Sequence, residues 1–350
     1  MQTPEGSLAH AAEQAERGAD TLAASCLQLR PGETVWLGSW SADTIAPMVA
    51  RALQRAGAVV KLCALDRFRD ATDERAALNE VSATLRGCSA SVLIAGGGLQ
   101  SGLSIGIIKA AGVARTRHIH MPRMDTRVLG SSVRADPDVL RQINARIEER
   151  LRRATTVRVT SGAGTEMRLG LDPRLPIVAD CGRPEPAQWD NLPTGFVYFH
   201  PVSAEGTYIA DRVALTGAGE ADAAHLRRSP LRVVLVRGAV QSFECADDSI
   251  RALFETYLGS HSEARRVGFA SIPTNYLART ELQHSTHDSL LPGIKLHLGY
   301  PDRARTGATY DAAVQFRLTG RRQSVRAGDT AIVTTGRLER ALVEGLDPFR

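Results

Sequence analysis

The order of apolar segments in the first 155 residues is the feature that most constrains how this chain can fold. Short β-prone runs alternate there with segments whose apolar residues recur at helical spacing. The predicted strands are residues 34–37, 59–65, 91–95 and 118–121, and the predicted helices between them are residues 45–56, 73–85 and 102–111. Alternation at this spacing is typical of a parallel sheet covered by helices. The first half therefore predicts an α/β domain.

Two further helices and two helix caps belong to the same prediction. An amphipathic helix is expected at residues 8–26, where apolar residues share one face. Asp136 is placed to cap a longer helix that has Pro137 at its first position. We also expect Asp43 to cap the helix of residues 45–56.

The second half has a different pattern, with short strands separated by glycine-bearing turns. The predicted strands are residues 157–161, 166–169, 195–199, 207–214, 231–237, 267–272, 294–298, 311–318 and 330–334, with one helix at residues 247–258. Such a series is typical of an α+β domain with largely antiparallel pairing. A length of 350 residues also exceeds one ordinary core. The prediction is therefore a parallel-sheet α/β domain at residues 1–155 and an antiparallel α+β domain at residues 156–350.

The composition is that of a folded globular protein, with 43% hydrophobic and 23% charged residues. No apolar run approaches the roughly 18 residues of a membrane span, and the N-terminus lacks the pattern of a signal peptide. The five cysteines are widely spaced and form no C-x-x-C pair, which indicates reduced thiols. We therefore expect a cytoplasmic protein without a membrane partner.

Charge and glycine patterns favour neither nucleic acid nor a nucleotide as a partner. The net charge of +5 comes from 43 basic and 38 acidic side chains, and the basic residues are nearly all arginines. The arginine clusters near residues 150–153 and 321–326 lack interleaved aromatic residues. Gly96, Gly97 and Gly98 follow a predicted strand, but their spacing is not G-x-G-x-x-G, which favours a tight turn. No nucleic-acid partner and no cofactor are therefore expected.

Familiar catalytic patterns are also missing from the sequence. No G-x-S-x-G motif occurs, and no cysteine lies in a recognisable catalytic setting. His118 and His120 alternate along a predicted strand, but no third metal ligand lies near them in sequence, so structural histidines are favoured. One turn-to-strand junction remains of interest, because Pro193, Thr194 and Gly195 are placed to present the side chain of Phe196 into a cleft.

Four segments carry a family resemblance. They read T-V-R-V-T-S-G-A-G-T-E-M at residues 156–167, W-D-N-L-P-T-G-F-V-Y-F-H-P at 189–201, E-G-T-Y-I-A-D at 205–211 and P-G-E-T-V-W-L at 31–37. In these segments the chain resembles the thermophilic-type metallo-aminopeptidases, aminopeptidases T and S, and the related iron-dependent dihydroxypyridine dioxygenases. The resemblance implies a C-terminal domain that carries the active site and a dimer contact. It also implies metal ions held by carboxylates and imidazoles, two of them in the aminopeptidases.

The sequence departs from this family at the positions that the resemblance assigns to metal ligands. Phe196 follows P-T-G, where the family has a ligating glutamate, and Phe269 stands in the place of a second glutamate. Lys295 falls near the position of a ligating histidine, although a shift of two residues would select His297 instead. A phenyl ring cannot coordinate a metal. The resemblance therefore implies a member of the family without its metal ligands.

The last ligands of the family lie on one further strand, which aligns here with residues 309–314. Tyr310 and Ala312 then occupy the places of a histidine and an aspartate, and Asp311 would point to the opposite face of a regular strand. The dioxygenase branch uses a histidine and an aspartate of the same strand. The resemblance therefore implies that the metal ligands of the dioxygenases are missing from this chain as well.

These losses favour a catalytically inactive scaffold that keeps the old cleft for binding. No catalytic and no metal-binding residues are then expected, and Lys295 could meet a carboxylate while His200 or His297 donates a hydrogen bond. The expected ligand is a peptide or a partner protein, for example a precursor peptide in natural-product biosynthesis, and a homodimer through the C-terminal domain is expected. The predicted ligand-binding residues are Phe196, Tyr198, His200, Phe269, Lys295, His297 and Tyr310.

Two alternatives stay open at the level of sequence. His284, His287 and Asp288 form an H-x-x-H-D cluster with the donors of a zinc or iron site, to which His297 could contribute. The protein would then be a metal-dependent aminopeptidase or an iron dioxygenase with relocated ligands. The third class is a structural or oligomerisation subunit without a ligand.

Overall fold

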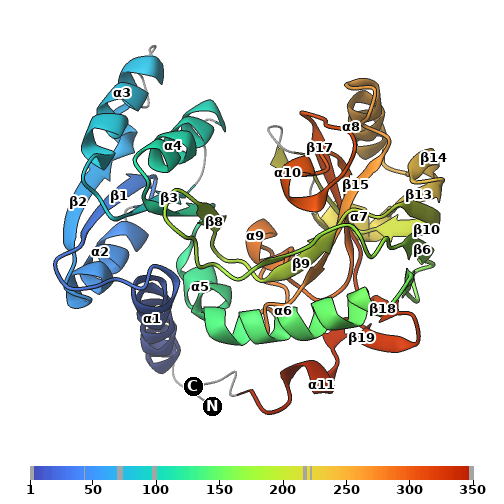
Figure 1. The fold of residues 1–350 in the computed structure, drawn as a ribbon, viewed down its shortest axis with the longest axis horizontal. Helices are drawn as coiled ribbons and strands as arrows, with labels where there is room; N and C mark the ends of the chain where they lie inside the picture. Colours follow the sequence, from blue (N-terminus) through green and yellow to red (C-terminus); the bar gives the residue numbers. More distant parts are fainter. Residues whose placement is uncertain are drawn as a thin grey trace. The chain divides into compact units, whose positions relative to one another are not determined.

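The structure is a computed structural model that describes residues 4–42, 44–68, 74–96, 101–215, 219–220 and 223–346. The expected helix cap Asp43 and the glycines Gly97 and Gly98 lie outside these residues. The chain forms two compact units, coloured along the sequence in Figure 1. Unit 1 comprises Met1–Val139 and Asp180–Thr194, and unit 2 comprises Leu140–Ala179 and Gly195–Arg350.

Unit 1 contains a five-stranded parallel sheet, sheet A, with the strand order β2-β1-β3-β4-β8. The strands are β1 (Thr34–Trp40), β2 (Val59–Ala64), β3 (Ala90–Ala95), β4 (Arg117–Pro122) and β8 (Trp189–Asn191). The helices are α1 (Pro4–Thr21), continued by the π-helical turn Leu22–Cys26, α2 (Ile45–Arg55), α3 (Glu74–Leu85), α4 (Ser101–Val113) and α5 (Thr126–Leu129), with 3₁₀ turns at Leu65–Phe68 and Ser132–Arg134. Figure 1 shows α3 and α4 on one face of the sheet and α1 and α2 on the other.

The core on the α3 and α4 side of sheet A is built around two tryptophans of β1. Trp36 and Trp40 pack there with Val81 of α3 and Leu93 of β3. The two indoles share this face because alternate residues of a strand point the same way. Gly38 lies between them, and a Cβ at this position would lie only 2.1 Å from Cη2 of Trp36. Glycine therefore leaves the space that the Trp36 ring fills.

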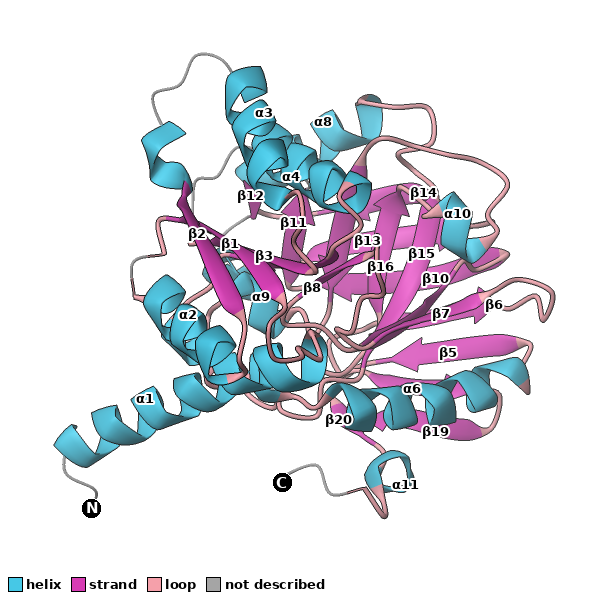
Figure 2. Cartoon of the chain, turned by 60° about the vertical axis from the view of Figure 1, so that its left-hand side comes forward, coloured by secondary structure: helices cyan, strands magenta, loops and turns pink. Residues whose placement is uncertain are grey.

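Unit 2 contains two large sheets (Figure 2). Sheet B has the order β14-β13-β10-β6-β5-β18-β19-β20 and sheet C has the order β12-β11-β17-β16-β15-β9-β7. The strands of sheet B are β5 (Thr156–Thr160), β6 (Glu166–Gly170), β10 (Ser203–Ala210), β13 (Leu231–Val236), β14 (Ala239–Glu244), β18 (Ser324–Ala327), β19 (Thr330–Thr334) and β20 (Arg337–Leu338). The strands of sheet C are β7 (Ile177–Asp180), β9 (Phe196–Phe199), β11 (Arg212–Leu215), β12 (Gly219–Glu220), β15 (Val267–Pro273), β16 (Lys295–Gly299) and β17 (Gln315–Thr319).

The helices described in this half of the chain are two longer ones and four short ones. They are α6 (Pro137–Arg152), α7 (Ala223–Arg228), α8 (Asp248–Gly259), α9 (Ser285–Asp288), α10 (Arg303–Thr306) and α11 (Arg340–Val343). The predicted cap of α6 is confirmed, because Asp136 Oδ1 accepts a hydrogen bond from the Asp138 amide at 2.7 Å. Asp247 caps α8 in the same way through the amides of Ser249 and Ile250.

The two faces of sheet C differ in chemistry. On β17, Phe316 and Leu318 are fully buried, and Phe316 packs against Phe254 and Tyr257 of α8 with ring centroids 5.0 Å from each. The alternate residues Arg317 and Thr319 point to the other face. That second face carries polar and aromatic side chains in place of aliphatic ones.

The parallel sheet A and the antiparallel sheets B and C confirm the predicted fold class. The strand predicted at residues 311–318 is present as β17 but begins only at Gln315, so the segment 309–314 that the resemblance aligns with a ligand strand is a loop, and Tyr310 lies in it. Strand β8 was not predicted, and it pairs in parallel with β4, so the segment Asp180–Thr194 returns to unit 1. No helix of the described residues is both long and apolar enough to cross a bilayer.

Candidate functional site

The register of sheet C brings five polar residues into one row across five neighbouring strands. Tyr198 of β9 pairs with Ser271 of β15, and Ser271 pairs with Lys295 of β16. Lys295 pairs with Thr319 of β17, which pairs with Arg212 of β11. Directly opposed residues of antiparallel strands place their side chains on the same face. These five residues are called the polar row below, and each is between 2% and 7% exposed.

Both ends of the polar row are closed by carboxylates. The Tyr198 hydroxyl donates a hydrogen bond to Asp302 Oδ2 at 2.6 Å. At the other end, Arg212 Nη1 lies 2.9 Å from Asp288 Oδ2, and both side chains of this ion pair are buried. A buried charge is costly unless it is paired and hydrogen-bonded. The two ends of the row therefore have their partners within the protein.

The centre of the row is different. Within the described residues, Lys295 Nζ takes part in no hydrogen bond or ion pair, and Thr319 Oγ1 is buried without a hydrogen-bond partner. Burial lowers the pKa of Lys295 to about 7; Asp211 opposes this shift, and Arg317 and Arg212 add to it. Lys295 is thus a desolvated amine that titrates near neutral pH.

An aromatic group lies beside the row. The Phe269 ring stacks on His297 with centroids 3.9 Å apart and an interplanar angle of 16°. The ring centroids of Tyr198 and Phe269 are 5.1 Å apart, and those of Phe196 and Tyr198 are 5.8 Å apart. Ser271 Oγ is within 3.2 Å of His297 Nε2, which joins the aromatic group to the polar row. Burial lowers the pKa of His297 well below its usual value, with Arg317 adding to the shift, so this imidazole is neutral at physiological pH.

The remaining two predicted residues lie together at the start of β15. His200 Nδ1 donates a hydrogen bond to the Gly268 carbonyl at 2.6 Å, and its ring is 5.8 Å from that of Tyr310. The Tyr310 hydroxyl donates to the Val267 carbonyl at 3.2 Å, and the Arg266 guanidinium lies 3.9 Å from the Tyr310 ring. Both side chains are thus tied to backbone carbonyls.

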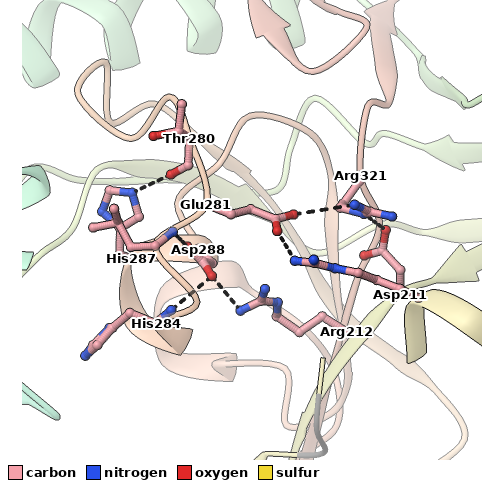
Figure 3. A network of polar contacts seen from close by, with 10 residues as sticks. Asp211, Arg212, Thr280, Glu281, His284, His287, Asp288 and Arg321 are labelled. Carbon is pink, nitrogen blue, oxygen red and sulfur yellow. Dashed lines mark hydrogen bonds and ion pairs between the residues drawn. The ribbon is translucent and has the colours of Figure 1, made fainter. Parts of the chain in front are cut away.

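The H-x-x-H-D cluster has a structural role (Figure 3). The Asp288 carboxylate accepts hydrogen bonds from the amides of Leu282 and His284 at 2.8 and 3.1 Å, in addition to its ion pair with Arg212. His287 Nε2 donates to the Thr280 carbonyl at 3.0 Å. These contacts fold the loop around α9 and fix it to β11. In the part of the chain that the structure describes, these side chains do not form a group placed to hold a metal ion.

A second set of charges holds the same loop from its other side (Figure 3). Glu281 is paired with Arg227 and lies 3.7 Å from Arg321 Nη1, and Arg321 is also paired with Asp211. Burial raises the pKa of Asp211, and the hydrogen bond from Arg321 opposes that shift. Asp211, the carboxylate whose charge acts on Lys295, is therefore already paired with Arg321.

The metal ions that the resemblance implies do not fit these residues. Among the side chains that the structure describes, no group of three or more His, Cys, Asp or Glu residues is placed to hold a metal ion. Phe196 and Phe269 offer rings on the face of sheet C, and the neighbouring Lys295 would place an ammonium group beside any cation. Metal ions need converging oxygen, nitrogen or sulfur donors.

Three residues of the site were not predicted from the sequence. Thr319, Arg212 and Ser271 belong to the polar row, but each is a common strand residue whose neighbours are distant in sequence. The only sequence signal was their alternation with apolar residues, for Arg212 and Ser271 within predicted strands and for Thr319 one residue beyond one. That signal indicates the polar face, and it does not indicate which residues face each other.

Comparisons with known proteins agree with the fold. The structure of 2,5-dihydroxypyridine dioxygenase from Pseudomonas putida KT2440 is similar with a TM-score of 0.62 and 17% sequence identity, covering 94% of this chain and 98% of that chain. AmpT, the aminopeptidase T of Thermus thermophilus, is similar with a TM-score of 0.66 and 14% identity, covering 93% of this chain and 99% of that chain. A comparison with curated protein sequences gave no match. The sequence profile described as 2,5-dihydroxypyridine 5,6-dioxygenase matches residues 24–266, and this chain belongs to that family.

Proposed function

We propose that this protein binds a peptide on the polar and aromatic face of sheet C and does not carry out metal-dependent catalysis. The observation that supports this most strongly is the pair Phe269 and His297, stacked 3.9 Å apart beside the buried amine of Lys295. A protonated amine repels a divalent cation, and aromatic rings supply no donor atoms for one. The rings suit the apolar part of an organic ligand, and the amine suits its anionic part. Where the family resemblance implies a site for metal cations, this face of sheet C is therefore proposed to bind an anionic group.

A peptide is the favoured ligand because the site offers both kinds of contact that a peptide needs. Phe196, Tyr198 and Phe269 supply an apolar wall for side chains. Lys295 and Thr319 supply polar groups for the termini or for polar side chains. In this proposal the protein holds a precursor peptide or a partner protein for another enzyme, and it forms a homodimer through unit 2.

Affinity-selection mass spectrometry with a defined mixture of short peptides tests the binding step. Phe269→Ala removes the ring that touches both Tyr198 and His297 and is expected to abolish retention of the selected peptides. Phe243→Ala is the matched control, because Phe243 packs against Phe254 of α8, on the other side of sheet C. Equal retention by the Phe269 variant and the unaltered protein would place binding elsewhere. Retention of no peptide at all would refute the peptide proposal.

Elemental analysis of protein purified without chelator tests the other half of the proposal. We expect no stoichiometric zinc, iron or cobalt, because among the described residues no donor side chains converge into a group that could hold a metal ion. Stoichiometric metal that disappears on changing His284 or His287 would refute the proposal.

A small aromatic acid is the second candidate ligand. The stack of Phe269 on His297 suits a planar ring, and the family profile is named for an enzyme of 2,5-dihydroxypyridine. Calorimetry with pyridine carboxylic acids separates the two candidates. Binding of these acids without retention of any peptide would favour the second one.

A further inference from the structure

The centre of the polar row contains buried polar groups that the protein itself does not satisfy. Thr319 Oγ1 is buried without a hydrogen-bond partner in the described part of the chain, and Lys295 directly opposes Thr319 across the two strands. Leaving a buried hydroxyl and a buried amine unsatisfied costs roughly 1–3 kcal/mol each or more. Buried polar groups that the protein does not satisfy are commonly satisfied by ordered water or by a bound ligand.

The charges around the row determine the sign of that partner. Arg212 is neutralised by Asp288, and Asp211 is engaged by Arg321, so neither compensates Lys295 directly. Arg317, on the same face, adds positive charge near Lys295. When Lys295 is protonated, its ammonium group therefore has no carboxylate of its own in the described part of the chain. A monoanion would balance it.

Access to this centre is offered by the next residues on the same face. His297 and Arg317 oppose each other on β16 and β17, and both are partly exposed, as is Phe196 on β9. Because Lys295 and His297 are two residues apart on β16, a ligand bound over these side chains lies on the face that carries Lys295. Its anionic end would then meet the amine, while its apolar part lies on the aromatic group.

We propose that Lys295 Nζ and Thr319 Oγ1 together bind a carboxylate group of the ligand. This inference rests on the proposed binding function of the same face and names the group that is recognised there. An ammonium group and a hydroxyl can each donate a hydrogen bond to one oxygen of a carboxylate. A carboxylate carries the one negative charge that balances the Lys295 ammonium group.

The small number of lysines makes this proposal directly observable. The chain contains only Lys61, Lys109 and Lys295, so protein labelled with carbon-13 in lysine gives three side-chain signals. Lys61→Arg and Lys109→Arg assign the two lysines outside the site. The probes are N-acetylphenylalanine for a terminal carboxylate, N-acetylglutamate amide for a side-chain carboxylate and N-acetylphenylalanine amide as the uncharged control.

We expect the Lys295 signal to shift with at least one of the two acids and not with the amide. The acid that gives the larger shift identifies the source of the carboxylate. Thr319→Val is expected to weaken the binding of that acid about tenfold, the loss of one hydrogen bond to a charged group. Thr330→Val, at an exposed position of β19, is the matched control and is expected to change nothing.

Each other outcome decides against one proposal only. If peptides are retained but neither acid moves the Lys295 signal, the carboxylate site is refuted and peptide binding stands. If an acid moves the Lys295 signal but no peptide is retained, the carboxylate site stands and the peptide proposal is refuted. A shift of equal size with the acid and the amide would also refute carboxylate recognition.

Discussion

Replacing Lys295 by methionine is expected to stabilise unit 2, by an amount that depends on pH in a defined way. Methionine keeps an unbranched chain of similar length and removes the buried amine. In the folded protein the pKa of Lys295 is lowered from 10.5 to about 7, mainly by burial. A lysine in the unfolded chain holds its proton up to about pH 10.5, whereas the folded chain releases it near pH 7.

The sign of the pH dependence follows from this difference in bound protons. Between about pH 7 and 10.5 the unfolded state binds more protons, so the free energy of unfolding of the unaltered protein rises with pH. Below about pH 7 both states are protonated, and the full cost of the buried charge is present, about 5 kcal/mol from the lowering of the pKa from 10.5 to about 7. The advantage of the Lys295→Met variant should therefore shrink by about 2.5 kcal/mol from about pH 7.5 to about pH 9.5.

The measurement must report on unit 2. All three tryptophans, Trp36, Trp40 and Trp189, lie in unit 1, so their fluorescence follows that unit and serves as an internal control. Hydrogen exchange of peptides that cover β15, β16 and β17 follows the unit that carries Lys295. Lys109→Met, at an exposed position of α4, controls for the loss of a lysine as such. A stability difference that stays constant across this pH range would refute the idea that Lys295 is a desolvated amine.

Three further substitutions test other parts of the structure. Asp288→Asn leaves Arg212 as an uncompensated buried charge and is expected to cost about 3–5 kcal/mol in urea unfolding, whereas Asp288→Asn combined with Arg212→Met is expected to cost less. Gly195→Ala is expected to destabilise by about 1–3 kcal/mol, because Gly195 has φ of +118° and a Cβ there would lie 2.9 Å from Leu140 Cδ2; a neutral result in thermal unfolding would contradict this. Phe196→Glu is expected to give neither stoichiometric zinc in elemental analysis nor hydrolysis of peptide substrates, because one carboxylate alone does not make a metal site.

The sequence predicted the architecture of this chain well, because the relevant signals are local. Helix and strand periods, the Asp136 cap and the change of pattern at Thr156 can all be recognised within windows of ten to twenty residues. The loop at residues 309–314 was mistaken for a strand because the family resemblance aligns it with a strand that carries ligands. In the structure, Asp311 Oδ1 accepts a hydrogen bond from the Ala312 amide at 2.9 Å, a local bond that favours a turn over extended pairing.

The candidate site was predictable only in part, because it depends on register. Phe196 and Phe269 could be proposed from a family resemblance, and both belong to the aromatic group of sheet C. That Lys295 faces Thr319, and that Tyr198 reaches Asp302, follows from pairings between segments far apart in the chain. Asp302 is especially hard to foresee, since it adopts a left-handed conformation with φ of +50° before the short helix α10.

The low pKa of Lys295 also gives the carboxylate proposal a pH dependence that no other residue of the row would produce. Only the protonated Lys295 amine carries the positive charge that balances a carboxylate. The observed affinity for the acid therefore scales with the protonated fraction of Lys295. With a pKa of about 7 in the free protein, affinity should fall about tenfold from its acid limit by pH 8 and about a hundredfold by pH 9. His297 is neutral throughout this range, and Asp288 and Asp302 lie at the closed ends of the row.

Lys295→Arg provides the matched comparison for this last prediction. Arginine keeps its charge at every pH in question, so a variant that still binds the acid should do so with an affinity that is nearly constant from pH 7 to pH 9. Calorimetry of N-acetylphenylalanine in buffers of different ionisation enthalpy should also detect uptake of about one proton per ligand at pH 8 by the unaltered protein, and none by the arginine variant. A flat affinity profile for the unaltered protein would mean that the carboxylate binds without the Lys295 ammonium group, which would remove the charge argument for the centre of the polar row.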